Sequence, residues 1–165
     1  MKEANGHPDA KPHRSLNGSL KSTGAVTLAT YRESQMYPRI VRAVDEILAS
    51  GKVVTPVDIL VAIGILDRKR IEDWRRGRTP YLERVIEGNL MRLSSLLRIL
   101  RYHAHDLKLK PSWTAYLHRG KGPKQRLRFT RTGDPKIEEA YATHFVWPGR
   151  DPFYPSTSAG RGIGA

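Results

Sequence analysis

The chain has 165 residues, no cysteine, and 29 Lys and Arg residues against 16 Asp and Glu residues, a formal net charge of +13. This length fits one domain with flexible ends, and the lack of cysteine excludes disulfides, cysteine-based zinc sites and thiol catalysis. Without a membrane-spanning apolar run or a secretory signal, we expect a soluble cytoplasmic protein. So positive a charge indicates a polyanionic partner, above all nucleic acid, and a nucleoid association if the source is bacterial.

The two ends of the chain differ in composition from its middle. Residues 1–30 and 148–165 are rich in small polar residues, glycine and proline, which predicts a disordered arm and a disordered tail. Residues 31–147 form the single predicted domain, with 23 basic and 13 acidic residues and thus a net charge of +10. The positive charge is therefore expected mainly in the folded part.

Three short helices are predicted in the first half of this domain. The first spans 38–50 and has an apolar stripe at helical spacing. The second starts with Thr55 as the cap and Pro56 at the first helical position. Asp67 caps the third helix. Capping side chains and apolar spacing agree here on where each helix begins.

A long amphipathic helix is predicted from Thr79-Pro80 to about Leu107, weakened locally by Gly88. Such a stripe is usually part of a core, but a helix this long also suggests a homodimer through residues 82–100. Its apolar face contains Leu82, Val85, Ile86, Leu90, Leu93, Leu96, Leu97 and Leu100.

The pattern then alternates every second residue, which predicts a β-hairpin over about 113–130. Trp113 is expected on its core face, and Tyr116 with His118 on its exposed face. Asp134 caps a last helix, expected to turn Tyr141 and Phe145 inward. The fold class is therefore mainly α, a helical domain with one long amphipathic helix and a C-terminal hairpin.

Residues 55–78 resemble the helix-turn-helix DNA-binding unit. The spacing between Gly64 and Ile71 is one residue longer than usual, and Leu60 replaces a small residue, so a plain helical corner is the alternative. The residues that carry the resemblance are Ile59, Ile63, Gly64, Ile65, Ile71 and Trp74.

The resemblance implies that the second helix of this unit enters the major groove of DNA. Its early residues, Arg68, Lys69 and Arg70, would then contact bases. Residues at and just past its end, Arg75, Arg76 and Arg78, would contact phosphates.

The predicted hairpin forms a second basic segment. Eight basic residues and no acidic residue lie between Lys108 and Arg131. Glycines near the tip allow close approach to a phosphate, in the manner of the wing of winged-helix proteins. The expected contacts are Arg119, Lys121, Lys124, Arg126, Arg128 and Arg131 with phosphates, and Tyr116 with a base. A merely solvated hairpin face is the alternative.

These segments together predict a non-enzymatic protein that binds duplex DNA, a regulator or a nucleoid-type factor, without metal or cofactor. Histidines and carboxylates are too scattered along the sequence to assemble a nuclease site, which leaves catalysis as a minor alternative. An RNA-binding module is the second interpretation, since a basic hairpin with an exposed tyrosine suits single strands. An adaptor that meets an acidic protein is the third.

Overall fold

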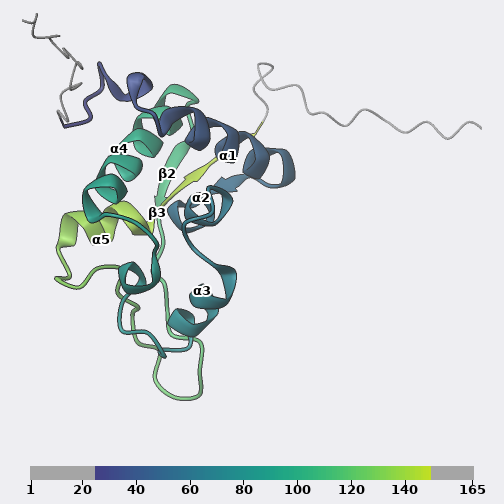
Figure 1. Cartoon of the computed structure of the whole chain (residues 1–165). Coiled ribbons are helices and arrows are strands. Elements are labelled where there is room, and N and C mark those ends of the chain that lie inside the picture. Colours follow the sequence, from purple (N-terminus) through teal and green to yellow (C-terminus); the bar gives the residue numbers. More distant parts are fainter. Residues whose placement is uncertain (1–24, 150–165) are drawn as a thin grey trace, which may run out of the picture.

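The computed structural model describes residues 25–149, so residues 1–24 of the predicted arm and 150–165 of the predicted tail lie outside the described residues. The fold is mainly helical with a small antiparallel sheet, in agreement with the coarse prediction (Figure 1). The elements are the 3-10 turns η1 (Tyr31–Glu33) and η2 (Leu82–Val85), the helices α1 (Tyr37–Ser50), α2 (Pro56–Ala62), α3 (Arg68–Arg75), α4 (Leu90–Asp106) and α5 (Pro135–Ala142), and the strands β1 (Val53–Val54), β2 (Lys110–Trp113) and β3 (Thr143–Val146).

The helix starts predicted from capping side chains are confirmed. Thr55 Oγ1 accepts from the backbone N–H of Asp58 at 3.0 Å and starts α2. Asp67 Oδ1 accepts from Lys69 N–H at 2.6 Å and starts α3, and Asp134 likewise caps α5. Each cap satisfies an amide that has no partner within its own helix, which explains why local sequence located these starts.

The long helix predicted from Thr79 to Leu107 is wrong in its first third. The chain forms η2, breaks at Gly88, and begins α4 only at Leu90. Gly88 has a φ of 148°, which residues other than glycine rarely adopt. Asn89 then caps α4, because its Oδ1 accepts from Met91 N–H at 2.8 Å. The break therefore has a local cause in the Gly-Asn pair.

The predicted hairpin is also wrong as a pair of regular strands. Between Trp113 and the start of α5, the β-pairing consists of one isolated bridge, between Leu117 and Arg126. The sheet has the order β1-β3-β2, and β2 pairs with β3, from Lys110 opposite Val146 to Trp113 opposite Thr143. Phe145, expected on the last helix, lies buried in β3 instead.

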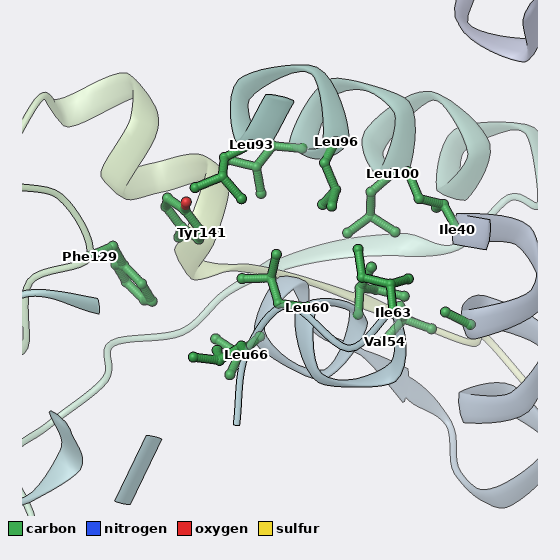
Figure 2. Packing of buried hydrophobic residues seen from close by; sticks show 14 of the residues in the cluster. Ile40, Val54, Leu60, Ile63, Leu66, Leu93, Leu96, Leu100, Phe129 and Tyr141 are labelled. Atoms are coloured by element: carbon green, nitrogen blue, oxygen red, sulfur yellow. The ribbon is translucent and has the colours of Figure 1, made fainter. Parts of the chain in front are cut away.

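The core lies between α1, α2, α4 and the sheet (Figure 2). Leu60, Val54 and Ile40 meet the leucines of α4 there, and Tyr141 with Phe129 extends the core toward α5. The interpretation of the leucine stripe as core is confirmed for Leu93, Leu96, Leu97 and Leu100, which are all buried. The homodimer through residues 82–100 stays a prediction.

None of the helices in residues 25–149 combines the length and the apolar character needed to cross a bilayer. Figure 1 shows α3 and the long connection between β2 and α5 together at one end of the molecule, away from α1 and α4. We call that connection, residues 114–134, the basic loop. The two basic segments of the sequence, α3 and the basic loop, therefore lie at the same end of the molecule.

Candidate nucleic-acid interface

The helix α3 is held by two buried side chains and exposes its basic ones. Ile71 and Trp74, one helical turn apart, are both buried. The early basic residues Arg68, Lys69 and Arg70 are all exposed to solvent. With Ile71 and Trp74 facing inward, Lys69 points most directly away from the core, and Arg68 and Arg70 flank it in the first turn of α3.

The turn before α3 is fixed by the backbone. Gly64 has a φ of 80°, and Ile65 N–H donates to the carbonyl of Leu60 at 3.0 Å. Arg39 of α1 donates to the carbonyl of Ile63 at 2.6 Å and secures the end of α2. These bonds close α2 in the manner of a Schellman cap and set the direction in which α3 leaves it.

Trp74 joins α3 to the basic loop. Its indole Nε1–H donates to the carbonyl of Arg128 at 2.8 Å, and its side chain has no exposed surface. Its ring centroid lies 5.2 Å from that of Phe129 and 5.6 Å from that of Tyr116. Aromatic packing with a satisfied indole N–H makes α3 and the basic loop one packed unit.

A second junction lies at the C-terminal end of α3. Arg119 N–H donates to the carbonyl of Arg75 at 2.6 Å. The His118 ring Nε2 hydrogen-bonds the carbonyl of Arg76 at 2.9 Å. Two basic segments that are far apart in the sequence therefore lie side by side, through backbone carbonyls that the end of a helix leaves unpaired.

The tip of the basic loop is the most accessible part of this surface. Residues 119–126 are all exposed, and Lys121 and Lys124 make no ion pair within residues 25–149. Gly122 has a φ of 111°, a conformation that glycine adopts readily, and its lack of a side chain lets the backbone of the tip approach a ligand closely. Two lysines on such a turn are free to follow a phosphate backbone.

Three of the predicted phosphate contacts make an ion pair or a side-chain hydrogen bond within the protein. Arg119 lies 3.4 Å from the Glu72 carboxylate and Arg78 lies 3.0 Å from that of Asp73. These ion pairs are exposed, so they contribute little and a phosphate can replace them. Arg128 Nη2 donates to the carbonyl of Arg131 at 2.6 Å, a bond that shapes the end of the loop. Arg76 is likewise exposed and makes no ion pair within residues 25–149.

Tyr116 is not the exposed residue that the alternation predicted. It is partly buried, its ring packs on Phe129, and its hydroxyl shares a hydrogen bond of 2.8 Å with His144 Nε2. Burial raises the pKa of Tyr116 to about 12 and lowers the pKa of His144 below its usual value. Both groups are therefore neutral at pH 7, and Tyr116 supports the loop from inside.

The hydroxyl of Tyr116 faces a small hollow that the sequence did not reveal. Its volume is about 300 Å³, and Thr55, Asp58, Arg75 and His144 line it. The Nε of Arg75 is buried there without a hydrogen-bond partner among the described residues. The residues that line this hollow come from the start of α2, from α3, from the basic loop and from β3. They are far apart in the sequence, so residue spacing could not predict the hollow.

Trp113 was predicted in the core and instead is 53% exposed. It ends the edge strand β2, whose residues are all exposed, and the guanidinium carbon of Arg126 lies 4.9 Å from its ring centroid. The cause of the error is the sheet: Trp113 pairs with Thr143 rather than with the far side of a hairpin, so its side chain leaves the predicted core face.

Glu138 closes the basic loop from the side of α5. Its buried carboxylate accepts from Thr130 N–H and from the Thr130 hydroxyl, each at 2.7 Å, and from Phe129 N–H at 3.1 Å. An acidic residue in the first turn of a helix also complements the helix dipole. Its position in the first turn of α5 gave no indication that it also binds the loop.

Comparison with known proteins returned no match to a family model, to a curated protein or to a solved structure. Within the described part of the chain, no three His, Cys, Asp or Glu side chains converge in a way that could hold a metal ion. Evidence about function therefore comes from the arrangement of the residues themselves.

Proposed function

We propose that this chain is a non-enzymatic nucleic-acid-binding protein that contacts duplex DNA through α3 and the basic loop. In this proposal α2 and α3 act as a helix-turn-helix-like unit, and the loop acts as a wing beside it. A regulator or a nucleoid-type factor is the class of protein that would use such a surface.

The observation that carries the proposal is the junction between the two basic segments. Trp74 binds the carbonyl of Arg128, and the Arg75 carbonyl accepts from Arg119, so α3 and the loop are held as one surface. No acidic residue lies between Lys108 and Arg131 in the sequence, and the ion pair that the loop makes with α3 joins Arg119 to Glu72. Two basic segments held side by side in this way support a partner with a phosphate backbone.

The residues of this surface divide by position. Arg68, Lys69 and Arg70 are exposed on the first turn of α3, where a groove-reading helix makes its base contacts. The phosphate contacts are assigned to residues at the end of α3 and in the loop: Arg75, Arg76, Arg78, Arg119, Lys121, Lys124, Arg126, Arg128 and Arg131.

Competition on one labelled probe tests this proposal. Duplex DNA should displace a bound duplex more effectively than structured RNA does, and changing Arg68 and Arg70 to Ala should flatten the differences in affinity between DNA sequences. A protein whose duplex is displaced preferentially by RNA would be an RNA-binding module instead. Failure to bind either nucleic acid, with retention of an acidic protein partner, would favour the adaptor interpretation.

A further inference from the structure

A second hollow on the described surface lies beside the basic loop, on the side of α5. Its volume is about 540 Å³, which falls in the usual range of small-ligand pockets, roughly 300–1,000 Å³. Residues of the strand β2, the basic loop and the start of α5 line it, namely Trp113, Arg126, Leu127, Arg128, Gly133, Pro135, Glu138 and Glu139.

The wall formed by Trp113 has the chemistry of a stacking platform. More than half of this side chain is exposed, although tryptophan usually buries most of its surface. The guanidinium of Arg126 lies over the ring at 4.9 Å from the centroid, so a flat cation already occupies one position on this platform. An exposed indole next to arginine is a recurrent way of holding an unstacked nucleobase.

The lining of the hollow also provides a hydrogen-bond acceptor. The carboxylate of Glu138 is saturated by Phe129 and Thr130, but the neighbouring Glu139 is exposed and makes no side-chain hydrogen bond or ion pair within residues 25–149. A free carboxylate accepts from the amino and imino groups of a base edge and repels carbonyl oxygens. Glu139 therefore favours a base with adjacent donors, such as guanine, over thymine.

The charge of the surroundings identifies what kind of molecule brings the base. Arg126, Arg128 and Arg131 border the same stretch of the loop, and their cations suit the phosphates on either side of the base. A free apolar ligand or a hydrophobic peptide would bring no anion to these cations. Charge complementarity thus points to a nucleotide within a polynucleotide.

We infer that this hollow receives an unpaired or extruded nucleobase, stacked on Trp113 and read at its edge by Glu139, while the basic loop holds the adjoining backbone. The inference rests on the proposed function and narrows it, since the preferred target becomes a nucleic acid with an unpaired nucleotide next to a duplex. Extrusion from an intact duplex requires unstacking, so a base that is already unpaired binds at lower cost.

The test compares a short duplex with the same duplex carrying one unpaired guanine, each labelled and titrated with the full-length chain. The unpaired guanine should raise the affinity, and Trp113→Ala should remove about tenfold of affinity for that probe while leaving duplex binding nearly unchanged. Leu117→Ala is the matched control, because Leu117 is an exposed apolar residue of the same loop that does not line the hollow.

Two further measurements, of fluorescence quenching and of base preference, test the roles of Trp113 and Glu139. Probe binding should quench the fluorescence of the wild-type protein more than that of Trp113→Phe, and Glu139→Gln should reduce the preference for an unpaired guanine over an unpaired thymine. Equal affinity for the intact and the unpaired probe, or an equal loss for both in Trp113→Ala, would overturn the inference and leave duplex binding intact. Absence of binding to every probe would overturn the proposed function together with it.

Discussion

Glu138 is a buried carboxylate whose hydrogen bonds hold the end of the basic loop against α5. It accepts from two backbone amides and one hydroxyl, all of which are buried with it. Its partners are adjacent in the chain, at Phe129 and Thr130, so one side chain fixes both the loop and the neighbouring core.

Replacing this carboxylate should destabilise the protein strongly. Glu138→Ala leaves two amides and a hydroxyl without an acceptor, and we expect a loss of about 2–4 kcal/mol in the free energy of unfolding. Glu139→Ala, at the exposed neighbouring position, should change it by about 0.5 kcal/mol or less. Urea unfolding of both variants measures the difference, and equal losses would show that the buried hydrogen bonds do not stabilise the loop.

The burial of Trp113 and Tyr116 could not be predicted from the alternating sequence pattern. Alternation placed Trp113 inside and Tyr116 outside, and the structure reverses both positions. Alternation identifies two faces but does not say which one is buried, because that depends on the partner strand. Here the partner is β3, and no local feature of residues 113–117 indicated it.

At the level of elements, local signals were sufficient for helix starts and insufficient for strand pairing. The capping side chains accept from backbone amides at most three residues away, as Thr55, Asp67 and Asp134 do. Their capping roles can therefore be predicted from the neighbouring sequence alone. The pairing of β2 with β3 joins segments separated by the whole basic loop and α5. Such non-local pairs are decided by packing, which a single sequence does not display.

The contact between Gly77 and His118 links two elements and offers a specific test. Gly77 has a φ of 74°, and a Cβ at this position would lie 2.8 Å from His118 Nε2. Gly77→Ala should therefore strain the backbone and also displace the His118 ring from the carbonyl of Arg76. The junction at the end of α3 would then keep only the bond from Arg119 N–H to the Arg75 carbonyl.

Gly64→Ala is the matched control, because Gly64 has a similar φ of 80° and no atom within 4 Å of its added Cβ. We expect Gly77→Ala to lose about 1 kcal/mol more than Gly64→Ala, the value of the hydrogen bond to Arg76. Thermal unfolding measures this difference, and binding to duplex DNA should weaken more in Gly77→Ala. Indistinguishable variants would mean that the His118 junction does not position the loop.

At the level of the whole molecule, the central features are a net charge of +13 and two basic segments, α3 and the basic loop, that the fold holds side by side. The sequence predicted both basic segments correctly as exposed stretches, since Arg68–Arg70 and residues 119–126 are all accessible. Their proximity could not be predicted, because it depends on the buried bond between Trp74 and the Arg128 carbonyl. The hollow at Trp113 was missed for the same reason.

The salt dependence of duplex binding tests most directly whether the basic loop contacts a phosphate backbone. We expect the logarithm of the affinity to fall linearly with the logarithm of salt concentration between about 50 and about 300 mM. Changing Lys121 and Lys124 to Ala should make this slope shallower by about 2, since each lost phosphate contact removes about 0.9, and should weaken all sequences evenly. A slope that is flat, or identical in the wild type and the variant, would contradict the account.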